Sequence, residues 1–165
     1  MTDSKPSKTE RKRRQHALQQ LGERLLELSQ EQLASLELDE RLQDALTDAR
    51  KMTSHEALRR HKQYIGKLMR NVDAEPIEAL FAKLKADDRR EKRVFADAER
   101  WRDRIVNEGH AALAELEADI GTSLDDVAER VDELERAVSD RAEKTLKRDI
   151  FRRIHAALAA RTADR

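Results

Sequence analysis

Apolar residues recur at three- and four-residue spacing along almost the whole chain, a period that is typical of α-helices. The clearest example lies within residues 57–77, where an apolar face opposes a basic face. The apolar face holds Leu58, His61, Ile65, Leu68, Met69 and Val72. The basic face holds Arg59, Lys62, Gln63, Gly66 and Arg70. The pattern predicts an amphipathic helix that buries one side and leaves cations outside.

Capping residues predict where the helices of the first half begin. Ser7, with Glu10 three residues later, fits a capping box, in which each side chain bonds the other residue's backbone N–H. The first helix should then follow a stripe of leucines, namely Leu18, Leu21, Leu25, Leu28 and Leu33. Asp39 is placed to cap a short second helix, and Thr53 or Ser54 to cap the basic helix.

The second half is predicted to contain five more helices. One begins after Asp73, and a separate, densely charged one covers residues 87–107. Gly109 is expected to end that helix, since glycine readily adopts the left-handed conformation of a helix C-terminus. A turn at residues 121–123 follows a short helix, and Ser123 is expected to cap the next one. The apolar stripe of that helix is Leu124, Val127, Val131, Leu134 and Val138, and the stripe of the last helix is Leu146, Ile150, Ile154, Ala157 and Leu158.

These elements predict an all-α, multihelical fold. We expect two small helical bundles, residues 7–72 and 73–160, joined by or sharing the long charged helix. A single continuous bundle is the alternative, because no linker rich in Pro or Gly separates the halves. Residues 1–6 are expected to be a disordered N-terminus and residues 161–165 a tail. Composition agrees with a helical protein, since aromatic residues make up only 3% of the chain.

The sequence shows none of the residue arrangements that catalysis commonly requires. There is no cysteine, which excludes disulfides, thiolate chemistry and zinc ribbons. The five histidines show no metal-ligand spacing, no glycine-rich phosphate loop occurs, and no nucleophile stands beside a base. We therefore expect no enzyme, no cofactor and no metal. Neither a membrane span nor a secretory signal is evident, which favours a cytoplasmic protein.

Charge is strongly segregated along the chain although the net charge is zero. Residues 50–70 carry seven positive side chains and one negative one, whereas residues 108–143 carry twelve acids and three arginines. Basic faces of this kind attract polyanions, while acidic faces limit indiscriminate binding. The alternative is that basic and acidic segments pair with each other inside the bundles.

The basic segments supply a candidate RNA-binding set. Its members are cations near the N-terminus, along the basic helix and near the C-terminus, with one tyrosine and one glycine between them. They are Lys12, Arg13, Arg14, Arg59, Arg60, Lys62, Tyr64, Gly66, Lys67, Arg70, Arg148 and Arg152. Tyr64 lies at the border of the apolar and basic faces, where it is either a stacking platform for an unpaired base or a boundary residue with its hydroxyl in water.

Gly66 needs a physical reason, because glycine inside a helix is about 1 kcal/mol less favourable than alanine. One explanation is a phosphate chain that approaches the helix backbone closely at the centre of the basic face. The other is close packing of two helices within the bundle. We favour the first explanation, because Gly66 lies opposite the apolar stripe, and we expect Arg59, Lys62, Gly66 and Arg70 to form one exposed patch.

Three segments resemble the YjgA/DarP family of ribosome-associated proteins. They are ALRRHKQYIGKLMR followed by DAEPI, SKTERKR followed by LQQLGERLLEL, and LKRDIFRRIHAAL. The resemblance implies an accessory factor that docks on precursors of the large (50S) ribosomal subunit. Such a factor would bind the rRNA of that subunit and promote late maturation of the peptidyl-transferase region, without catalysis and as a monomer off the ribosome.

A different class of function remains open from the residues alone. A helical adaptor could use an amphipathic groove and its charged faces to bind another protein in the cytoplasm. Salt separates the two hypotheses, because binding through many phosphates weakens steeply with ionic strength, whereas docking in an apolar groove changes little.

Overall fold

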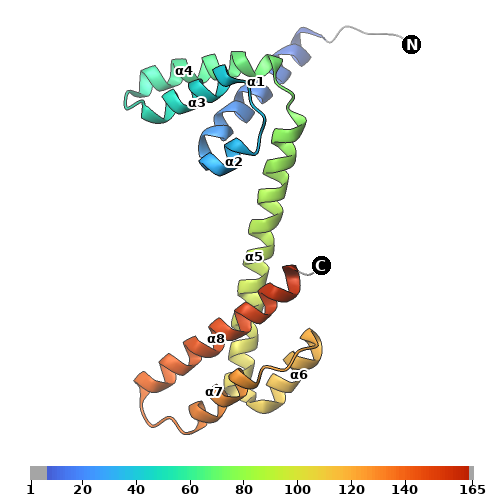
Figure 1. Cartoon of the computed structure of the whole chain (residues 1–165), viewed down its shortest axis with the longest axis vertical. Coiled ribbons are helices and arrows are strands. Elements are labelled where there is room, and N and C mark those ends of the chain that lie inside the picture. Colours follow the sequence, from blue (N-terminus) through green and yellow to red (C-terminus); the bar gives the residue numbers. More distant parts are fainter. Residues whose placement is uncertain (1–6, 164–165) are drawn as a thin grey trace, which may run out of the picture. The chain divides into compact units, whose positions relative to one another are not determined.

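The computed structural model describes residues 7–163, which form eight α-helices and two short 3-10 helices (Figure 1). The predicted all-α, multihelical class is confirmed. The elements are α1 (Lys8–Arg24), η1 (Leu25–Glu27), α2 (Gln30–Ala34), α3 (Glu40–Lys51), α4 (His55–Leu68), η2 (Met69–Asn71), α5 (Glu75–Glu108), α6 (His110–Ile120), α7 (Asp125–Glu135) and α8 (Asp140–Ala163). The expected disordered N-terminus, residues 1–6, lies outside the described residues.

The chain divides into two compact units, Met1–Leu84 and Lys85–Arg165. The division lies inside α5, twelve residues beyond the bundle boundary that we expected between Val72 and Asp73. Ile77 explains the difference, since it is buried in the core of the first unit with Leu80 and Leu84 packed against that core. The first turns of α5 therefore belong to the first unit.

Helix α5 is one continuous helix of 34 residues, so the prediction of two separate helices was wrong. The segment that we read as a boundary contains neither glycine nor proline. Ion pairs between neighbouring turns stabilise it instead, with Arg90 2.9 Å from Asp87 and Lys92 2.8 Å from Asp88. Helix α8 likewise continues into the expected tail, as far as Ala163.

The helix starts in the first unit follow the predicted caps. Ser7 and Glu10 form the capping box, with the Ser7 N–H donating to Glu10 Oε2 at 2.6 Å and the Glu10 N–H to Ser7 Oγ at 3.2 Å. Asp39 accepts a hydrogen bond from the Arg41 N–H at the start of α3, and Ser54 caps α4. These three predictions are confirmed.

The first helix ends earlier than the leucine stripe suggested, since α1 stops at Arg24 and does not reach Leu33. Arg50 of α3 stabilises this end from outside. Its guanidinium donates to the backbone carbonyls of Leu25 and Leu26, at 3.5 and 3.4 Å, and to that of Leu28. The first two of these carbonyls lie in η1, where the Leu25 carbonyl also accepts the Leu28 N–H at 3.3 Å, so Arg50 stabilises the short helix that follows α1.

Two glycines bring α1 and α4 unusually close together. A Cβ atom at Gly22 of α1 would lie 2.8 Å from side-chain atoms of Ile65 and of Met69. A Cβ atom at Gly66 of α4 would lie 3.0 Å from the Cβ and Cγ of Gln19 and 3.3 Å from its Cα. Each glycine therefore faces the other helix. We call this contact the glycine crossing.

The second unit has its own core, built by the later part of α5 with α6, α7 and α8. Its fully buried side chains include Ile105, Leu116, Val127, Val131, Ile150 and Ile154. Gly109 and Gly121 adopt positive φ values of 60° and 73° at the ends of α5 and α6, as their positions predicted. Trp101 is only partly buried at the edge of this core, with the Arg104 guanidinium 4.9 Å from its ring centroid.

Two predictions for this unit were wrong. Leu124, not Ser123, occupies the N-cap position of α7, and the Ser123 hydroxyl donates to the carboxylate of Asp125. Val138 was expected in the apolar stripe of that helix but is fully exposed. The helix ends at Glu135, so Val138 falls in the loop before α8 and no longer follows the helical period.

The glycine crossing predicts unequal effects of adding one methyl group on each side. Gly22→Ala should destabilise the first unit, because overpacking of fully buried Ile65 and Met69 costs about 1–3 kcal/mol, which exceeds the helix-propensity gain of roughly 1 kcal/mol. Gly66→Ala should be the milder change, since Gln19 is only partly buried. Thermal melts of the two variants, beside the exposed control Gln20→Ala, test the order; a Gly66→Ala variant less stable than Gly22→Ala would contradict it.

Candidate nucleic-acid interface

The first turns of α1 form an exposed basic segment. All residues from 7 to 17 are exposed, so this part of the helix extends beyond the core to which its later turns contribute. Residues 8–14 include five cations, Lys8, Arg11, Lys12, Arg13 and Arg14. The one acid among them, Glu10, is engaged by the backbone N–H of Ser7. Positive charge therefore dominates this segment.

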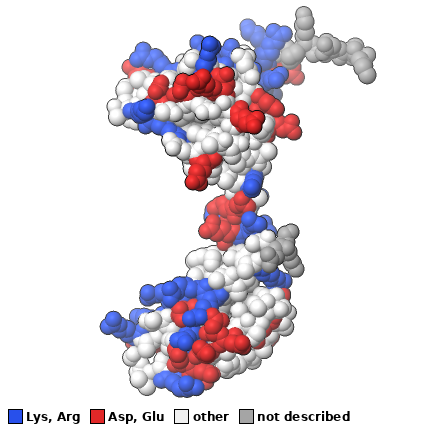
Figure 2. All heavy atoms as spheres, viewed as in Figure 1, with Lys and Arg blue, Asp and Glu red and all other residues white. Residues whose placement is uncertain are grey.

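The end of α4 adds two further cations to this region. Glu23 pairs with Lys62, and Gln19 faces Gly66, so the residue numbers on α1 fall as those on α4 rise and the two helices are antiparallel. Helix η2, which follows α4, also contacts α1. Lys67 and Arg70 therefore lie toward the basic turns of α1, and Figure 2 shows blue side chains gathered at this end.

We call Lys12, Arg13, Arg14, Lys67 and Arg70 the basic cluster. All five side chains are exposed. Across residues 7–163, none of the ion pairs involves any of them. Their charge is therefore not neutralised by a neighbouring carboxylate of the described chain.

The expected exposed patch of Arg59, Lys62, Gly66 and Arg70 is not formed. Lys62 is partly buried and forms an ion pair with Glu23 of α1 at 3.2 Å, while Gly66 packs against Gln19. The face that we took as free is partly covered by α1. Arg59 and Arg70 stay exposed but lie eleven residues apart, which is about 16 Å along a helix. Arg60 is exposed and pairs with Glu56 at 3.5 Å.

Tyr64 is 45% exposed at the surface of α4. Its ring centroid lies 5.8 Å from that of His61, whose Nε2 is 2.8 Å from the backbone carbonyl oxygen of Ala45. His61 is therefore a hydrogen-bonded histidine at the edge of the core. Tyr64 keeps an accessible ring, and both hypotheses for it, platform and boundary residue, remain predictions.

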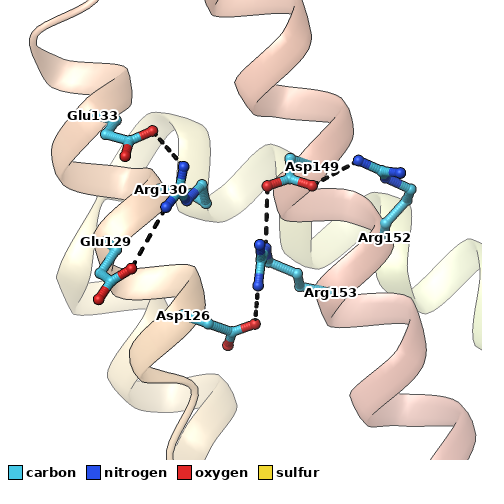
Figure 3. A network of polar contacts seen from close by, with 7 residues as sticks. All are labelled: Asp126, Glu129, Arg130, Glu133, Asp149, Arg152 and Arg153. Carbon is cyan, nitrogen blue, oxygen red and sulfur yellow. Dashed lines mark hydrogen bonds and ion pairs between the residues drawn. The ribbon is translucent and has the colours of Figure 1, made fainter.

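The two C-terminal candidates differ in their partners. Arg148 of α8 is exposed and takes part in none of the ion pairs among the described residues, whereas Arg152 pairs with Asp149 at 2.7 Å. Figure 3 shows that Asp149 also accepts from Arg153 Nε at 3.1 Å, and that Arg153 reaches on to Asp126 of α7. This chain of charges holds α7 against α8, so Arg152 belongs to a structural network.

Arginine neighbours also set the acidity of Asp149. The hydrogen bond from Arg153 lowers the pKa of the Asp149 carboxyl below its ordinary value, and Arg152 lowers it further. Glu108 shows the same effect at the end of α5, where the hydrogen bond from Arg104 lowers its pKa. Both carboxylates thus stay ionised at neutral pH and are neutralised by arginine.

Comparison with known proteins identifies the family of the chain. The model of the family described as "Dual-action ribosomal maturation protein DarP" matches residues 4–159. The chain belongs to this family. The predicted resemblance to the YjgA/DarP family is thereby confirmed, and it extends over nearly the whole sequence.

Individual DarP relatives match to different extents. The protein of that name from Nitrosomonas europaea is 48% identical over 107 residues, which is 65% of this chain and 60% of the relative's length. The one from Thiobacillus denitrificans is 38% identical over 159 residues, covering 94% of this chain and 88% of the relative. In the first comparison the match therefore spans less than two thirds of the DarP relative.

Metal binding and membrane insertion find no support in the described part of this DarP-family chain. Among residues 7–163, no three side chains of His, Cys, Asp or Glu are grouped so that they could hold a metal ion. None of the helices over the same residues combines the length and apolar character needed to cross a bilayer.

The Asp149 network in this DarP-family chain predicts a pH-dependent contribution to stability. A carboxyl whose pKa is lowered by folding stabilises the fold above its unfolded pKa, about 4, and this stabilisation is lost as the pH falls through the folded value. Arg153→Met should therefore be less stable than wild type at pH 7, and the difference should shrink below about pH 4. Urea unfolding of both proteins at pH 7 and at a pH below about 4 measures this difference in stability.

The control for this comparison is Arg136→Met. Arg136 is exposed and forms an ion pair with Asp132 at 4.0 Å. Exposed ion pairs of this kind contribute little to the free energy of unfolding. A stability difference for Arg153→Met that stays constant down to pH 2 would show that packing, and not the ionised Asp149, accounts for it.

Proposed function

We propose that this protein is a ribosome-associated maturation factor that binds rRNA of the large (50S) subunit. It docks on 50S precursors in the cytoplasm through the basic cluster and promotes late maturation of the peptidyl-transferase region. It acts by charge and shape, without catalysis and without a cofactor. Off the ribosome it is a monomer. Membership of a family of ribosomal maturation proteins supports the general role.

The observation that carries the RNA-binding part of this proposal is the concentration, in the basic cluster, of cations that form no ion pair within residues 7–163. The chain has no net charge, and many of its arginines and lysines are already matched with carboxylates. The five residues of the cluster are not. Cations without a protein partner can neutralise phosphates and release counterions, which is the main source of affinity for an RNA backbone.

The other candidates take different places in this proposal. Arg59 and Arg148 are exposed without ion pairs among the described residues and can extend the contact. Arg60, Lys62 and Arg152 must exchange a carboxylate for a phosphate, so each contributes less. Gly66 acts indirectly, because it allows α4 to approach α1 and so brings the end of α4 toward the basic turns of α1.

Reversing two charges of the basic cluster tests the proposal. Arg13→Glu combined with Arg70→Glu should abolish co-sedimentation with 50S precursors at low salt, since two phosphate contacts become repulsive. Both side chains are exposed, so helix content and melting temperature should hardly change. Sedimentation of the tagged protein at low and high salt, with circular dichroism as the folding check, measures both effects.

The matched control is Lys51→Glu combined with Lys83→Glu. These lysines are exposed in the same unit, outside the basic cluster, and give the same change in net charge. An equal loss of co-sedimentation in both double variants would mean that binding depends on net charge alone. Undiminished sedimentation of the Arg13/Arg70 variant, with binding that resists high salt, would contradict RNA docking and favour the protein-adaptor alternative.

A further inference from the structure

The second unit carries an exposed aromatic cluster that the basic faces do not explain. Phe95 of α5 is 48% exposed, although it lies beside the core residue Val94. Its ring centroid is 5.1 Å from that of Phe151 and 6.2 Å from that of His155, both on α8. The rings of Phe151 and His155 are 5.8 Å apart. Phe95, Phe151 and His155 thus form one continuous patch, the aromatic cluster.

The ring arrangement leaves π surface available on Phe95. Its contacts with Phe151 and His155 are edge-type, with interplanar angles of 67° and 69°, so the neighbours do not stack on it. Two edge contacts and about half of the residue in water are compatible with one open ring face. A planar partner could stack there without any rearrangement of the core.

Cations flank the aromatic cluster on one side. The Arg102 guanidinium lies 5.6 Å from the Phe151 centroid. Arg148 precedes Phe151 by three residues and His155 by seven, spacings that place all three on one face of α8. The nearby acid on α8, Asp149, is neutralised by Arg152 and Arg153. A stacking surface therefore adjoins the unpaired charge of Arg148.

A hollow of about 350 Å³ lies on the other side of His155, between α5 and α8. Its lining includes the Glu91 carboxylate and the Thr162 hydroxyl beside apolar Val94. A carboxylate accepts hydrogen bonds from exocyclic amino groups of bases. The Thr162 hydroxyl already donates to the Ala159 carbonyl at 2.8 Å, so it too can serve a base edge only as an acceptor. The hollow has room and polar groups for the edge of a base.

We propose that the aromatic cluster and this hollow form a binding site for one unpaired RNA nucleotide. The base stacks on Phe95, its edge turns toward Glu91 and Thr162, and an adjoining phosphate contacts Arg148. Single-stranded RNA combines a π face with a phosphate, the two features that this surface matches, whereas a protein partner needs neither. The inference rests on the proposed RNA-binding function and adds preference for unpaired segments.

Two substitutions of Phe95 in the full chain separate stacking from packing. Phe95→Leu keeps an apolar side chain but removes the ring, and Phe95→Tyr keeps the ring. Fluorescence anisotropy with a labelled, unstructured single-stranded RNA should show an affinity about 5- to 150-fold lower for Phe95→Leu, and near wild type for Phe95→Tyr. Affinity for a fully paired, blunt-ended RNA duplex should be unchanged in both variants.

The control is Val138→Ala, which alters an exposed apolar residue elsewhere in the same unit. Equal binding of single-stranded RNA by Phe95→Leu and wild type would overturn the site and leave the patch for a protein partner. Equal losses of affinity for single-stranded RNA and for the duplex, with a lower melting temperature, would also overturn it, by showing a structural role. A wild-type protein that binds neither RNA would instead refute the proposed function itself.

Discussion

The arrangement of the first unit depends on the glycine crossing of α1 and α4. With a side chain at Gly22, the helices could not stay at their present distance, because the added carbon would overlap Ile65 and Met69. Close approach buries those two residues completely. It also fixes the register in which Lys62 meets Glu23 and Arg70 turns toward the basic start of α1. Core packing and surface charge in this unit thus share one geometric cause.

The basic segments of the sequence do not correspond directly to positive surfaces in the folded protein. Several cations are engaged within the fold: Arg50 binds helix-end carbonyls, Arg24 covers the Phe81 ring at 3.8 Å, and Arg153 links α7 to α8. What distinguishes the basic cluster is therefore the lack of carboxylate partners among the described residues, not a high count of positive residues. A neutral protein can in this way present a strongly positive end.

Most of the fold could be predicted from local features of the sequence, such as capping residues and glycines at helix ends. The capping residues Ser7, Asp39 and Ser54 and the positive-φ Gly109 act through bonds to neighbours in sequence, so their roles could be read directly. Features that depend on residues distant in sequence could not be predicted in this way. The partner of Lys62 is thirty-nine positions away, and the stop of α1 is stabilised by Arg50 from another helix. Gly66 and Lys62 lie on the side of α4 opposite its apolar stripe, yet α1 covers part of that side.

Helix α5 runs through two separately packed cores, and each half of the molecule holds one residue that can report on it optically. The single tyrosine, Tyr64, belongs to the first unit and the single tryptophan, Trp101, to the second. Tryptophan fluorescence therefore follows only the loss of structure around α5, α6, α7 and α8. Circular dichroism follows both units together. Comparison of the two signals during unfolding reveals whether the shared helix makes the halves melt as one cooperative body or as two.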